Sequence, residues 1–105
     1  SLDYVALVII YDFDKSNSKG VELVDNSINE LSNIGIPSLT LSSSNFLNDK
    51  ILDKSKQISE AYNVDQTTLK TMIRSNPGII LLKKGTVISK FHWRDAPNNW
   101  DEYID

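Results

Sequence analysis

Residues 74–93 read Arg-Ser-Asn-Pro-Gly-Ile-Ile-Leu-Leu-Lys-Lys-Gly-Thr-Val-Ile-Ser-Lys-Phe-His-Trp, and this stretch decides the predicted fold. The group Asn76-Pro77-Gly78 predicts a turn, because a residue that precedes proline is driven out of the helical region. Residues 79–82 form an unbroken apolar run, which is typical of a strand buried on both faces. Lys84-Gly85 then predicts a turn into a second strand over 86–93. Alternation along that strand predicts one face with Val87, Phe91 and Trp93 and an opposite face with Lys90 and His92.

The N-terminal third predicts a strand, a helix and a second strand. Residues 4–11 are a continuous β-branched and aromatic run, as in a central parallel strand. A polar loop follows, in which Ser16 or Ser18 is expected to cap the helix. The helix itself is indicated by apolar residues at helical spacing, and Gly35 is expected to end it. A strand over 36–41 completes a β-α-β unit, for which a right-handed crossover is expected.

The middle and the end of the chain carry shorter elements. A second helix is predicted from Asn48, an edge strand over 61–64, and a third helix capped by Asp65 or Thr67. Pro97 suits the first turn of a last helix. Its inward side is expected to carry Trp100, Tyr103 and Ile104.

Composition limits the possible functions. The 105 residues predict one domain, 1–105, with an ordinary 40% apolar and 24% charged content. A net charge of −3, with the basic residues scattered, argues against nucleic acid or an anionic membrane as partner. The chain has no cysteine and one histidine, which excludes disulfides, thiolate catalysis and cysteine or histidine metal clusters. It starts Ser1-Leu2-Asp3 without a methionine or a signal-peptide pattern, so we expect a fragment of a longer protein.

A helix, a proline turn and a β-hairpin close to a C-terminal helix resemble the thioredoxin fold, and the resemblance covers nearly the whole chain. It implies an α/β three-layer sandwich with helices on both faces of a mixed five-stranded sheet. The additional strand and helix before the proline turn resemble the TlpA and peroxiredoxin branch of that fold. The implied strand order is 61–64, 36–41, 4–11, 78–83, 86–93, with only the last strand antiparallel. The resemblance also implies a cis Asn76–Pro77 bond, although only about 5–6% of prolyl bonds in folded proteins are cis.

A narrower resemblance rests mainly on residues 65–97. The run 65–78, Asp-Gln-Thr-Thr-Leu-Lys-Thr-Met-Ile-Arg-Ser-Asn-Pro-Gly, and the run 81–85, Leu-Leu-Lys-Lys-Gly, resemble a thioredoxin-like tail domain. That domain occurs at the C-terminus of some bacterial DoxX-type membrane proteins. The resemblance implies a bacterial protein in which a segment outside this sequence tethers the domain to the cell membrane. It leaves the side of the membrane open.

The redox site of thioredoxins, a Cys-x-x-Cys at the start of the first helix, is missing from this chain. Depending on how the motif is aligned with this chain, its four positions are occupied by Ser16-Asn17-Ser18-Lys19 or by Ser18-Lys19-Gly20-Val21. A serine hydroxyl stays protonated without a base, and this loop contains no histidine. By the resemblance, a binding cleft would lie between the helix start and the proline turn. Its predicted residues are Ser16, Asn17, Ser18, Lys19, Ser75, Asn76, Pro77 and Gly78.

Other residues with chemical potential have structural explanations. His92 is interpreted as a partly exposed strand residue, because no second histidine or acid–base pair accompanies it. Asp95 fits a helix cap equally well. Trp93 and Trp100 are expected to close the core under the last helix, as large apolar residues usually do. Asp12 and Asp14 are interpreted as solvated loop carboxylates, since no further oxygen ligands for a metal are evident.

These observations favour a thioredoxin-like domain without redox activity that serves as a binding or accessory module. The expected partner is an extended peptide or another protein at the cleft; no cofactor, nucleic acid or direct membrane contact is expected. The alternative is an enzyme subunit that binds a thiol cofactor or a peptide there, as glutathione transferases do. Those enzymes also need a helical second domain and an acidic residue beyond the hairpin, where this chain has Ser89-Lys90.

Overall fold

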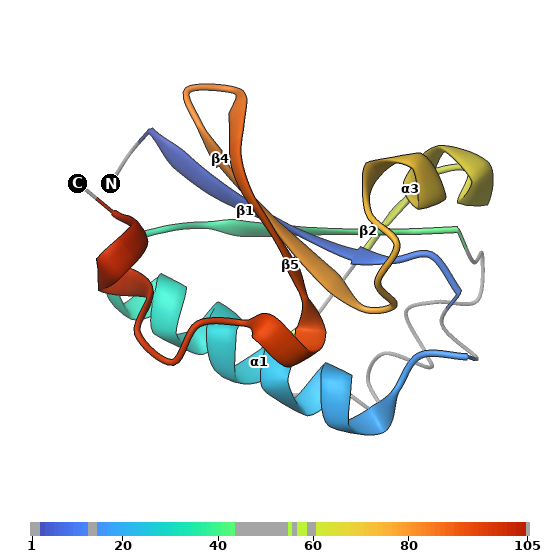
Figure 1. Ribbon diagram of the computed structural model, residues 1–105, viewed down its shortest axis with the longest axis horizontal. Helices are drawn as coiled ribbons and strands as arrows, with labels where there is room; N and C mark the ends of the chain where they lie inside the picture. The colour runs from blue at the N-terminus through green and yellow to red at the C-terminus, as the bar shows by residue number, and fades with distance from the viewer. Residues whose placement is uncertain (1–2, 13–14, 44–54, 56, 59–60, 105) are drawn as a thin grey trace.

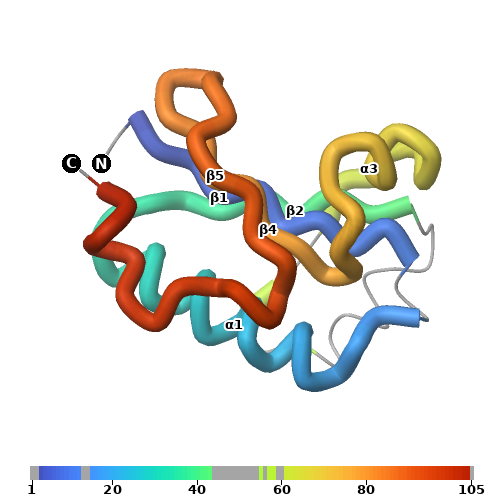
Figure 2. Tube along the Cα trace, in the orientation of Figure 1, coloured from blue at the N-terminus to red at the C-terminus, as the bar shows by residue number. Residues whose placement is uncertain are grey.

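A mixed five-stranded sheet with a helix on each face forms the centre of the protein (Figures 1 and 2), in a computed structural model. The structure describes residues 3–12, 15–43, 55, 57–58 and 61–104. The strands are ordered β3-β2-β1-β4-β5 across the sheet, which is the predicted order. In chain order the elements are β1 (Tyr4–Ile10), α1 (Ser18–Asn33), β2 (Ser38–Ser42), β3 (Tyr62–Asn63), α3 (Gln66–Met72), β4 (Gly78–Lys83), β5 (Thr86–His92) and the 3₁₀ helices η1 (Trp93–Asp95) and η2 (Trp100–Tyr103).

The direction of β4 corrects the prediction that only the last strand is antiparallel. β2 pairs with β1, and β3 with β2, in parallel, whereas β4 is antiparallel to β1, with Ile9 opposite Gly78. β5 is antiparallel to β4 and so has the direction of β1. The short α3 accompanies this direction: its seven residues span about 10 Å, half the length of a six-residue strand of about 20 Å. The chain stays near the edge of the sheet where β1 ends, and β4 begins there.

The alternation of β1 supplies two separate cores. Tyr4, Ala6, Val8 and Ile10 face α1, whereas Ile9 faces α3. The α1 side also contains Ile79 and Leu81 of β4, Phe91 of β5 and the buried Trp100 of η2. On the other side, Leu69 of α3 and Ile73 pack against Ile9 and Ile80. Figure 1 shows the arrangement, with α1 and the C-terminal segment below the sheet and α3 above it.

A β-bulge changes the faces of β5. Leu81 lies opposite Ser89, but its neighbour Leu82 lies opposite Val87, so Ile88 is an extra residue in β5. Because directly opposed residues share a face, Val87 lies on the same side as Leu82 and Lys90. The prediction that Val87 shares a face with Phe91 is therefore wrong, since a strict period of two cannot continue through a bulge.

The end of α1 and the start of β2 follow from local chemistry. Gly35 has a φ of 83° and donates its N–H to the Ser32 carbonyl, while Ile36 donates to Leu31. This is a Schellman motif, and it confirms Gly35 as the end of the helix. Because Ile36 closes the motif and Pro37 has no N–H, β2 begins at Ser38 and not at residue 36.

The C-terminal helix predicted from Pro97 is instead the short 3₁₀ helix η2, which begins at Trp100 and is capped by Asn99. Trp100 is fully buried as expected, and its ring meets that of Phe91 edge-on, with the ring centres 5.2 Å apart. Tyr103 lies at the surface, 40% exposed, and touches Phe91 with one edge. Ile104 is half-buried and packs against the same core, so Trp100 and Ile104 have the inward role expected, whereas Tyr103 does not.

The helix predicted from Asn48 lies mostly outside the described residues. Ser55, Gln57 and Ile58 are described and are not helical, and Ile58 is buried in the core on the α1 side. Asp65 caps α3 as predicted, since its carboxylate accepts the Thr68 N–H at 3.2 Å. Within the described ranges, no helix combines the length and apolar character needed to cross a bilayer.

We expect Trp100→Ala to lower the free energy of unfolding by about 3–5 kcal/mol, the usual loss for a large buried aromatic residue. Trp100→Phe should lower the free energy of unfolding much less. Phenylalanine retains the aromatic contact and removes the indole N–H, which is buried without a hydrogen-bond partner among the described residues. Urea denaturation measures both variants. The exposed Glu102→Ala is the control and should stay within about 0.5 kcal/mol of the parent; a Trp100→Ala protein that is equally stable would contradict this account of the core.

Candidate functional site

The first turn of α1 is capped by Asn17. Its backbone is extended, and its side-chain oxygen accepts the Gly20 N–H at 3.0 Å. The prediction that Ser16 or Ser18 is the cap is wrong, because Ser16 is buried before the helix and Ser18 is already the first helical residue. If a redox motif is aligned with residues 16–19, its positions hold a buried serine, the capping Asn17 and the exposed Ser18 and Lys19. If it is aligned with residues 18–21, its last two positions, Gly20 and Val21, are buried.

The turn before β4 lies directly beside this helix start. The Asn76–Pro77 bond is cis, the isomer that the resemblance implies. The Asn76 carbonyl accepts the Asn17 N–H at 3.5 Å, and the Asn76 side-chain amide donates to the Asp12 carbonyl at 2.6 Å. The hydroxyl of Ser75 accepts the Trp93 N–H at 3.1 Å and donates to the Pro77 carbonyl. One turn thus binds the loop after β1, the start of α1 and the end of β5 together.

Gly20 makes the closest contact of this junction. A β-carbon at Gly20 would lie 2.9 Å from Cδ of Pro77 and 2.9 Å from two atoms of the Trp93 indole. Such distances are too short for carbon atoms in van der Waals contact. The helix can therefore approach the proline turn and the indole only because residue 20 has no side chain. The guanidinium of Arg94 covers the Trp93 ring at 5.1 Å from its centre.

The structure brings the eight predicted cleft residues together but leaves only part of them accessible. Asn17, Ser18 and Lys19 are exposed and Asn76 is half-buried, whereas the rest are buried: Ser16, Ser75, Pro77 and Gly78. Gly78 does not open the cleft, because a β-carbon there would meet Cδ1 of Ile73 at 2.8 Å. The accessible part of the cleft is thus a strip of residues 17–19 with Asn76.

His92 has a local structural role. It ends β5, is half-buried, and its Nδ1 accepts the Arg94 N–H at 3.1 Å, which caps η1. This confirms the interpretation of His92 as a partly exposed strand residue. Asp95 is not a cap but the last residue of η1. Within the described residues, no group of three or more His, Asp or Glu side chains is placed to hold a metal ion.

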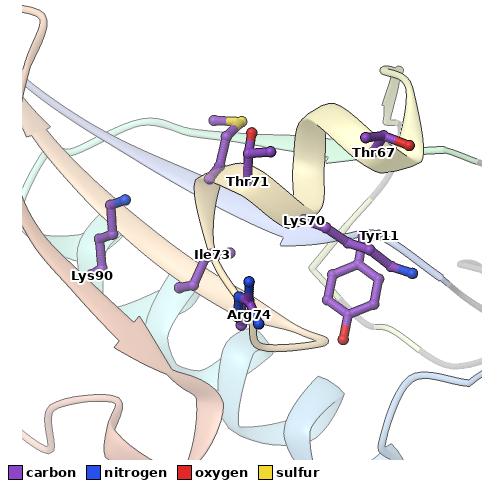
Figure 3. A pocket seen from close by; sticks show the side chains of 8 residues that line it. Tyr11, Thr67, Lys70, Thr71, Ile73, Arg74 and Lys90 are labelled. Carbon is purple, nitrogen blue, oxygen red and sulfur yellow. The ribbon is translucent and has the colours of Figure 1, made fainter.

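A basic groove on the α3 side was not predicted from the sequence (Figure 3). Its volume is about 870 Å³, and its lining consists of Tyr11, Thr67, Lys70, Thr71, Met72, Ile73, Arg74 and Lys90. The cations come from α3, from the turn that follows it, and from β5. Lys70 and Arg74 are close in the sequence, which was a usable signal, but Arg74 follows the end of α3 and Lys90 joins them only through the position of the hairpin.

Comparison with models of known protein families gives no match for this chain, and a search of curated proteins finds no relative.

We expect Gly20→Ala to lower the free energy of unfolding by about 1–3 kcal/mol, as overpacking usually does. In a helix, alanine is more stable than glycine by about 1 kcal/mol. A lower free energy of unfolding would therefore show that the clash with Pro77 and Trp93 outweighs the gain in helix propensity. Thermal denaturation followed by circular dichroism measures the change. Asn26→Ala, at an exposed position of the same helix, is the matched control and should be neutral or slightly stabilising.

In the Trp93→Ala background, Gly20→Ala should cost less, because the indole that opposes the new methyl group is gone. A Gly20→Ala protein as stable as the parent would mean that Pro77 and Trp93 move aside without loss, contrary to the close contact described.

Proposed function

We propose that this chain is a thioredoxin-like domain without redox activity, which works as a binding module of a larger, membrane-anchored bacterial protein. The observation that carries the proposal is the packing of the first turn of α1 against Pro77 and Trp93. Thioredoxin-like enzymes keep their reactive thiols at this position. Here Asn17 uses its side chain as a helix cap, and Gly20 lies against the proline ring.

Several features support a thioredoxin-like fold. The strand order agrees with the implied order, helices cover both faces of the sheet, and a cis-proline turn lies beside the start of the first helix. The chain has no cysteine, so it cannot pass electrons through its own thiols. A thioredoxin-like framework that lacks the cysteine nucleophile favours binding of a partner over catalysis.

The proposed binding strip consists of residues 17–19 and Asn76. The Asn76 N–H has no hydrogen-bond partner among the described residues, and its carbonyl accepts only the long bond from Asn17. A backbone with one unused donor and one weakly used acceptor can pair with an extended peptide, as in strand addition. Lys19, two residues after Asn17, is exposed and provides a charge for specificity.

The test is a set of NMR titrations of the ¹⁵N-labelled domain. A pool of extended peptides should shift the amide signals of residues 17–19 and 76. Lys19→Ala should weaken these shifts without unfolding the domain, since Lys19 is exposed, and Asn26→Ala should leave them unchanged. The domain should not accelerate the reduction of insulin disulfides by dithiothreitol, because it contains no thiol.

Other outcomes would redirect or refute the proposal. Saturable binding of reduced glutathione at residues 16–19 and 75–78 would favour the enzyme-subunit alternative. Faster insulin reduction by a preparation free of thioredoxin would contradict the absence of redox activity. The membrane anchor is tested separately, by reading the gene upstream of Ser1: four hydrophobic spans are expected there, and their absence would refute the DoxX-type assignment.

A further inference from the structure

The α3 face of the sheet is only partly covered. Figure 1 shows α3 above the ends of β1 and β2, to one side of the β4–β5 hairpin. On the hairpin, Val87 is 48% exposed and Lys90 is exposed on the same face. Between this open face and α3 lies the basic groove, so its two walls are provided by elements that are distant in the sequence.

The groove is positively charged, whereas the chain as a whole has a net negative charge. The protein has 14 acidic and 11 basic side chains, yet none of the described residues that line the groove is acidic. Lys70, Arg74 and Lys90 are all exposed, and no ion pair joins them to a carboxylate within the part of the chain that the structure describes. Three unpaired cations around one depression produce a local positive potential that attracts an anionic ligand.

The walls of the groove are not purely polar. The half-buried Met72 and the edge of Ile73 contribute apolar surface next to the cations. Nζ of Lys70 lies 5.4 Å from the centre of the Tyr11 ring, a cation–π contact that holds this ammonium group over the ring. In Figure 3, Tyr11 and Lys70 lie towards one end of the groove, Lys90 lies at the other, and Arg74 lies between them.

We propose that this groove binds an acidic peptide segment of another protein, one that alternates carboxylates with apolar side chains. Spread-out cations with apolar surface between them match such a segment. A single small anion would meet only one end of a groove of about 870 Å³. A nucleic acid would be repelled by the net charge of −3, and Tyr11, the one aromatic residue among the described lining residues, already lies under Lys70. The site is separate from the binding strip at residues 17–19.

Fluorescence anisotropy with a defined probe tests the proposal. The probe is a labelled pool of ten-residue peptides in which glutamate alternates with randomised apolar residues; a second pool has glutamine in place of glutamate. The glutamate pool should bind more tightly, and its affinity should fall as salt is raised, because exposed charges are screened. Arg74→Gln combined with Lys90→Gln should weaken binding roughly 2- to 30-fold, the range expected for two exposed ion pairs.

Lys84→Gln is the matched control: it removes one exposed cation at the β4–β5 turn, outside both the groove and the strip at residues 17–19, and should leave this affinity unchanged. Binding should shift the NMR signals of residues 67–74 and 90. Three results would overturn the proposal: no binding of the glutamate pool, equal binding of the glutamine pool, or tighter binding of an oligothymidylate than of either pool. Shifts confined to residues 17–19 and 76 would also refute the groove, while supporting the proposed function.

Discussion

The first turn of α1 lies directly against the ring of Pro77 and the indole of Trp93, with no room for a side chain at Gly20. This contact brings together three parts of the chain that are far apart in the sequence: the start of the first helix, the turn before β4 and the end of the sheet. Hydrogen bonds of Ser75 to Trp93 and of Asn76 to Asp12 fix the same turn. The relative position of α1 and the β4–β5 hairpin depends on this junction, because apolar packing alone is not directional.

The junction also restricts what this end of the protein can do. A reactive group at the start of α1 would have to be exposed and activated by a neighbour. Instead the positions are used for capping and close packing, and the one histidine is used as a cap at the other side of Trp93. Among the described residues, the start of α1 therefore presents an exposed strip at residues 17–19, while the basic groove lies on the opposite side of the sheet.

The sheet separates two layers of opposite character. On one side, α1, η1 and η2 carry mostly acidic charges, among them Glu22, Glu30, Asp101 and Glu102. On the other side lie the cations of the basic groove. Such an asymmetric distribution orients an approaching charged partner more than it adds to affinity. The short α3 contributes to this arrangement, since a longer helix would cover the hairpin face and fill the groove.

Sequence alone determined the features that have local causes. The apolar run at residues 79–82 predicted β4 to within one residue at each end, Gly35 ended α1, and Asp65 capped α3, because each depends on residues next to it in the chain. The tertiary structure decided the direction of β4, the bulge at Ile88, and the burial of Ser75 and Gly78 in the predicted cleft. It also assembled the basic groove. These features depend on which distant segments of the chain come into contact. Neither the alternation of residues along one strand nor the charge of a single residue predicts those contacts.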